Sequence, residues 1–99
     1  MIQERVYQAR RKQKERFEKS SYRFNADVPG AEMEKYFSMS REATDSLTQL
    51  VKKLNLSARA LHRLIRVART IADLDGEEQI LEQHILEAAC FRPSADYWQ

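Results

Sequence analysis

The chain has 99 residues, of which 42% are apolar and 32% charged, and this suits one small domain with a modest core. No apolar run approaches the ~18 residues that a membrane-spanning helix needs, and no apolar signal region stands at the N-terminus, so we expect neither a membrane nor a secreted protein. The single cysteine, Cys90, leaves no partner for an internal disulfide and favours a cytoplasmic location.

The net charge of +2 is too small to indicate a nucleic-acid-binding protein, but the charge is unevenly distributed. Residues 1–24 contain eight Lys or Arg and three acids, a balance of +5, so the remainder carries −3. Four apolar residues and one glutamine recur in this segment at near-helical spacing: Ile2, Val6, Ala9, Gln13 and Phe17. The pattern predicts a basic amphipathic helix over 2–18 that is solvated or lies between domains. Contact with a nucleic-acid backbone is the alternative.

A loop and a short helix are predicted between residues 20 and 37. Ser20 and Ser21 open the loop, and the turn-forming pair Pro29-Gly30 stands near its end. A helix over 31–37 would then bury three large side chains: Met33, Tyr36 and Phe37.

Ser40 predicts the start of the next helix, because its hydroxyl can accept a hydrogen bond from a first-turn amide. One apolar face follows at helical spacing, formed by Ala43, Leu47, Leu50, Val51 and Leu54. Asn55 is suited to end this helix in the left-handed conformation.

Ser57 is the predicted cap of a longer helix that runs to about Leu74, where Asp75-Gly76 stops it. Its apolar face is formed by Leu61, Leu64, Ile65, Ala68, Ile71 and Ala72. Its polar face, which we expect to be solvated, is formed by Arg59, His62, Arg63, Arg66, Arg69 and Asp73. At ~100° per residue the two sets separate almost completely.

A last helix is predicted over 81–91, with its buried face formed by Ile85, Ala88 and Ala89. Pro93 ends it, and the tail that follows carries Tyr97 and Trp98. The predicted fold is therefore all-α, a small bundle of about four to five helices.

Few residues of the chain form a catalytic, metal-binding or phosphate-binding motif. Neither Gly30 nor Gly76 lies in a phosphate-binding loop. His62 and His84 fall on different helices without metal-ligand spacing, so we expect surface or hydrogen-bonded histidines and no metal site. Cys90 is expected to be a small buried hydrophobe. We expect no enzyme activity from this chain on its own.

Arg59 stands at a helical position where stability alone would disfavour a cation. It occupies the second helical position after Ser57, where a cation opposes the helix dipole. A helix N-terminus and a forked guanidinium together form a good phosphate site. The alternative is a solvated helix face without a ligand.

The run Leu56–Leu74 reads LSARALHRLIRVARTIADL, and it resembles the C-terminal domain of magnesium chelatase-like AAA+ ATPases of the ComM/YifB competence protein family. Flanking segments are similar too, and the resemblance covers residues 2–92. Leu61 stands where relatives often carry an aromatic residue.

The resemblance implies a lid-type domain that covers the nucleotide of a larger ring ATPase, a hexameric motor acting on DNA in recombination during competence. By its position in the motif, Arg59 corresponds to the sensor-2 arginine, which contacts the γ-phosphate of ATP. ATP and Mg²⁺ would be bound only in the full-length protein. The partners implied are the upstream AAA+ core of the same chain, the neighbouring ring subunits and DNA.

The same resemblance divides the chain into a basic leading helix (1–19), a helical lid domain (20–92) and a tail (93–99). We expect the chain to be a segment of a longer protein. The alternative function is a stand-alone helical domain that binds nucleic acid or acts as a protein adaptor.

Overall fold

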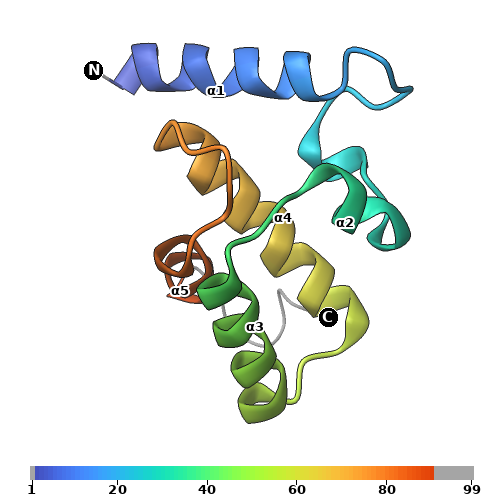
Figure 1. Cartoon of the computed structure of the whole chain (residues 1–99), viewed down its shortest axis with the longest axis vertical. Helices are drawn as coiled ribbons and strands as arrows, with labels where there is room; N and C mark the ends of the chain where they lie inside the picture. The colour runs from blue at the N-terminus through green and yellow to red at the C-terminus, as the bar shows by residue number, and fades with distance from the viewer. Residues whose placement is uncertain (1, 91–99) are drawn as a thin grey trace.

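The computed structural model describes residues 2–90, and these residues form an all-α domain, as predicted (Figure 1). Its helices are α1 (Ile2–Arg16), α2 (Met33–Tyr36), α3 (Arg41–Leu54), α4 (Ala58–Leu74) and α5 (Glu82–Cys90). Two short 3₁₀ turns, Asn25–Asp27 and Gly30–Glu32, lie between α1 and α2. The expectations for Pro93, Tyr97 and Trp98 lie outside the described residues.

The other helices are arranged around α4. Both α1 and α5 pack on α4, and α3 packs on α5. Figure 1 shows α1 crossing the C-terminal end of α4, with α3 and α5 on one side of α4 and α2 on the other. The start of α4 therefore lies far from α1, which matters for the site described below.

The helix ends follow the local chemistry of the sequence. The Ser40 hydroxyl accepts a hydrogen bond from the Ala43 amide at 3.1 Å, and the Ser57 hydroxyl accepts one from the Ala60 amide at 3.1 Å. Asn55 ends α3 in the left-handed conformation, with φ 51°. These caps satisfy amides and carbonyls that a helix leaves unpaired at its ends, and all three were predicted.

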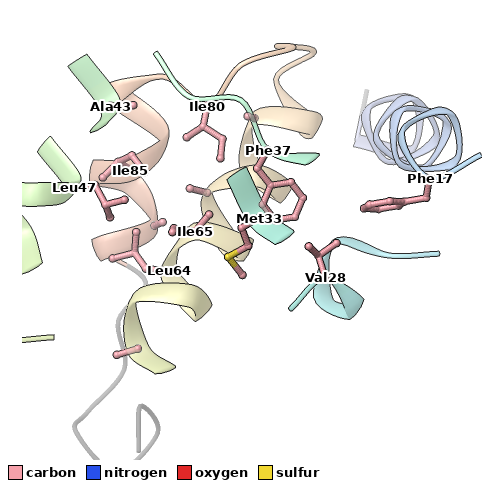
Figure 2. Packing of buried hydrophobic residues seen from close by; sticks show 14 residues of the cluster. Phe17, Val28, Met33, Phe37, Ala43, Leu47, Leu64, Ile65, Ile80 and Ile85 are labelled. Carbon is pink, nitrogen blue, oxygen red and sulfur yellow. The ribbon is translucent and has the colours of Figure 1, made fainter. Parts of the chain in front are cut away.

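The core lies where α3, α4, α5 and the α2 region meet (Figure 2). Leu64 is 1% exposed and Ile85 is fully buried. Ile80 is also fully buried, and its backbone pairs with the chain between α2 and α3: the Ile80 amide donates to the Ser38 carbonyl, and the Ser40 amide donates to the Ile80 carbonyl, both at 2.9 Å. The predicted apolar face of α4 is thus confirmed at its centre.

Two residues expected on buried or apolar faces are exposed. Cys90 is exposed, because α5 buries His84, Ile85 and Ala88, and Cys90 lies two residues, or ~200°, beyond Ala88. Leu54 is 38% exposed, because burial decreases towards the end of α3. The short helix also differs from the prediction, since residues 30–32 form a 3₁₀ turn and α-helix begins at Met33.

Across residues 2–90, no helix combines the length and the apolar character that crossing a bilayer requires.

Candidate functional site

The N-terminus of α4 carries Arg59 as its second residue, in the position predicted from the sequence. The side chain is exposed, and the first turn of α4 contains no acidic residue. The comparable position in α3 differs. There the second helical residue is the acid Glu42, and Arg41 precedes it, directly after the Ser40 cap. The cation of α4 therefore opposes the helix dipole without a local acid to offset it.

The start of α4 also has hydrogen-bond donors without acceptors. Between residues 2 and 90, no hydrogen bond or ion pair involves the Arg59 guanidinium, and the amides of Ala58 and Arg59 have no acceptor. The Ser57 hydroxyl accepts only the Ala60 amide. Free amides and a forked guanidinium at one helix end together suit an anion such as a phosphate group.

The rest of the predicted polar face of α4 is less solvated than expected, and for Arg69 and Asp73 the prediction was wrong. Arg69 is only 1% exposed and Asp73 is fully buried. Arg69 donates to the carbonyls of Glu77 at 2.7 Å and Glu78 at 2.8 Å, and pairs with Asp73 at 3.0 Å. Burial lowers the pKa of Arg69, and the neighbouring Asp73 carboxylate opposes that shift. Arg69 thus holds the connection between α4 and α5.

Asp73 also joins α1 to α4. Its carboxylate accepts hydrogen bonds from Arg16 at 2.6 Å and from the side-chain amide of Asn25 at 3.0 Å. Two cations therefore share one buried carboxylate, in a network of charged and polar groups. At the other end of α1, Arg5 donates to the Leu74 carbonyl at 3.2 Å and to Asp75 at 3.0 Å.

The middle of the polar face packs against the loop before α2. Arg66 donates to the Val28 carbonyl at 2.9 Å. The His62 ring lies so close to Gly30 that a β-carbon added there would stand 2.1 Å from His62 Cε1. His62, Arg63 and Arg66 are half-buried. Arg59 is therefore the one residue of the predicted polar face of α4 that is exposed.

The two histidines have structural surroundings. His84 is fully buried, and both ring nitrogens are engaged: the Leu81 amide donates to Nδ1 at 2.9 Å, and Nε2 lies 2.9 Å from the Asp75 carboxylate. Of the two alternatives expected for the histidines, surface or hydrogen-bonded, His84 is the second. Within the described part of the chain, no three His, Cys, Asp or Glu side chains gather closely enough to hold a metal ion.

The network around Asp73 could not be recognised from the helical pattern alone. A signal did exist, because Asp73 is the only acid on a face with four arginines, and α1 supplies further cations. A lone carboxylate in that setting favours ion pairing. The sequence does not say which arginines pair with it, since Arg16 and Asn25 are far away along the chain.

Comparison with known proteins identifies relatives of this domain. The chain is 38% identical to "Competence protein ComM" of Haemophilus influenzae over 91 residues, which are 92% of this chain and 17% of that protein. It is 37% identical to "Uncharacterized protein YifB" of Salmonella typhimurium and 36% identical to the Escherichia coli protein of that name, with the same coverage. The chain thus spans about a sixth of these relatives' length.

No solved structure matches the chain. A sequence model of the family described as "Magnesium chelatase, subunit ChlI C-terminal" matches residues 1–92, nearly the whole chain. The chain therefore belongs to the magnesium chelatase ChlI C-terminal family, with relatives among the ComM and YifB proteins.

Proposed function

We propose that this chain is the C-terminal lid of a ComM-type AAA+ ATPase, and that Arg59 is its sensor-2 residue. The observation that carries the proposal is the exposed guanidinium in the first turn of α4, next to two amides without acceptors. A cation at that position destabilises the helix. Binding of a phosphate group would account for the presence of Arg59 there.

In this proposal Arg59 acts on the terminal phosphate of ATP, which supplies the phosphoryl group that is transferred to water. The guanidinium donates paired hydrogen bonds to the phosphate oxygens, orients them and stabilises the negative charge that develops during transfer. The N–H groups of Ala58 and Arg59 add partial positive charge at the same end of the helix. The chain performs no hydrolysis alone, because the phosphate loop and the Mg²⁺ ligands come from the upstream AAA+ core.

The fold suits a lid that moves as one body. Arg69, Asp73 and His84 fix the C-terminal half of α4 to α1 and α5. A displacement of the domain would therefore carry Arg59 with it, so that lid closure brings the guanidinium to the nucleotide. The partners in this proposal are the upstream core and the neighbouring subunits of a cytoplasmic hexameric ring, with DNA as the substrate of the motor.

The direct test is to remove this domain from the full-length ATPase and return it separately. We expect the truncated protein to lose most of its ATP hydrolysis, and adding this 99-residue chain to restore part of it. Full hydrolysis by the truncated protein would contradict the lid function.

A further inference from the structure

A second surface lies at the opposite end of α4 from Arg59, between the outer face of α1 and the loop after it. It is an open hollow of about 820 Å³, and its lining includes Tyr7, Arg10, Lys14, Arg23 and Phe24. Figure 1 shows this loop turning away from the C-terminal end of α1 before it reaches α2. None of these residues takes part in the site at Arg59.

Two aromatic rings of this hollow face solvent. Tyr7 is 59% exposed and Phe24 is 60% exposed. Elsewhere among the described residues, the exposed large apolar side chains are Leu54 on α3 and Leu86 on α5, which are aliphatic and less exposed, at 38% and 48%. The exposed rings are therefore concentrated at one surface. They are exposed even though burying a ring removes about 150–250 Å² from water and stabilises a core.

The same hollow is rich in unpaired positive charge. Tyr7, Arg10 and Lys14 lie at positions i, i+3 and i+7, so they share one face of α1. Among the described residues, no ion pair involves the side chains of Arg10, Lys14 or Arg23. The acids nearby do not neutralise the positive charge, since the lining holds four Lys or Arg and two Glu. One of these acids, Glu15, pairs with Arg11 at 3.6 Å.

The loop that carries Arg23 and Phe24 is held in place against α1. The Asp27 carboxylate accepts hydrogen bonds from the amides of Arg23 at 3.3 Å and Phe24 at 3.1 Å. The next amide, that of Asn25, donates to Gln13 Oε1 at 2.9 Å. A ring fixed by its backbone loses little freedom when a ligand binds, which favours recognition by this surface.

We infer that this surface binds single-stranded nucleic acid. Bases stack on Tyr7 and Phe24, and the phosphates contact Arg10, Lys14 and Arg23. A duplex would leave the rings without a partner, because its bases are already stacked and paired. An acidic peptide would engage the cations but not the ring faces. The inference does not depend on the role of Arg59, which lies at the other end of α4.

The test measures binding of this chain to a fluorescent oligothymidylate of about 15 nucleotides at about 0.05 M salt. We expect weak binding that is lost as the salt concentration rises, because few phosphates are neutralised. Tyr7→Ala and Phe24→Ala should each weaken binding about tenfold. Phe24→Leu, which keeps an apolar side chain without a ring, should behave like Phe24→Ala.

The charge contribution is tested with Lys14→Gln, which should weaken binding and reduce the salt slope by about 0.7. The matched controls are Leu86→Ala, which removes an exposed apolar side chain on α5, and Lys53→Gln, which removes an exposed cation on α3. Both controls should bind as the parent does. Thermal melting of each variant checks that the fold is unchanged, as expected for exposed positions.

Any one of the following outcomes would overturn the inference. The first is no binding of the oligonucleotide at low salt. The second is binding that loses nothing when both rings are removed, or a duplex that binds as tightly as the single strand. The third is equal competition by polyglutamate, which would make the surface a site for acidic protein segments.

Discussion

Asp73 is the residue on which most of the internal polar structure converges. Its buried carboxylate pairs with Arg16 and Arg69, and it accepts a hydrogen bond from Asn25. A buried ion pair adds little net stability by itself, but removing one member leaves the other charge uncompensated. The two guanidinium groups around Asp73 would both suffer this loss.

We therefore predict that Asp73→Asn destabilises the fold by about 3–5 kcal/mol. The amide has nearly the same shape as the carboxylate, so the loss would come from charge rather than from packing. Asp45→Asn, on the exposed face of α3, is the matched control and should change little. Chemical denaturation measures both. Equal stability of Asp73→Asn and Asp45→Asn would show that the network does not hold α1 and α4 together.

Arg59 and Arg69 show what a helical pattern reveals and what it leaves open. Both lie on the predicted polar face of α4, and periodicity alone assigns both to solvent. Only Arg59 is exposed to solvent, because α1 and the connection to α5 cover the C-terminal half of that face. The first-turn position of Arg59 could be predicted from the Ser57 cap, since a cap is a local feature. Long-range packing of polar groups cannot be predicted in this way.

At the scale of the helices, the apolar face of α4 is the main source of stability. Leu64 is 1% exposed and Ile65 is 8% exposed, and both lie in the core cluster. Leu64→Ala and Ile65→Ala should each destabilise the fold by roughly 2–4 kcal/mol, because each leaves a cavity. Leu54→Ala, at a position that is 38% exposed, should cost less than about 1 kcal/mol. Thermal melting that ranks Leu54→Ala with the other two would refute the assignment of the core.

The contact between α4 and the loop before α2 gives a second prediction. Gly30→Ala places a β-carbon where the His62 ring now lies, so the ring must move, at a cost of about 1 kcal/mol or more. In a His62→Ala background this cost should disappear, because the space is then free. A double-mutant cycle measures the difference. A coupling near zero would mean that the His62 ring is not fixed against Gly30.

The elements themselves were largely predictable from sequence. Ser40, Asn55 and Ser57 set the ends of α3 and α4, because caps and left-handed residues act within one turn. The docking of α1 was not predictable, since it depends on Arg5 and Arg16 reaching the far end of α4. The exposure of Cys90 was missed although spacing indicates it, because Cys90 lies ~200° beyond Ala88 on the predicted buried face of α5.

For the whole molecule, the proposed lid function limits what the chain is expected to do alone. We predict that these 99 residues do not hydrolyse ATP and do not bind Mg-ATP with micromolar affinity, because in the proposed site one guanidinium and two amides would contact only the terminal phosphate. Isothermal calorimetry checks the affinity. A micromolar dissociation constant for Mg-ATP would mean that the chain holds a nucleotide site of its own.

The central claim, that Arg59 contacts the nucleotide, can be separated from any effect on folding. Arg59→Ala in the isolated chain should leave stability unchanged or raise it by about 0.3–1 kcal/mol, because a cation is removed from the positive end of the helix dipole. Arg41→Ala is the matched control, since Arg41 is an exposed first-turn arginine that follows a serine cap in α3.

The most direct measurement is the steady-state ATP hydrolysis rate of the full-length ATPase that carries each of these changes. We predict that Arg59→Ala lowers the rate by about 10²-fold or more, while Arg41→Ala leaves it near the parent value. Arg59→Lys should restore only part of the loss, because an ammonium group cannot donate two parallel hydrogen bonds. Equal rates for Arg59→Ala and Arg41→Ala would contradict the account, because Arg59 would then be an ordinary surface cation.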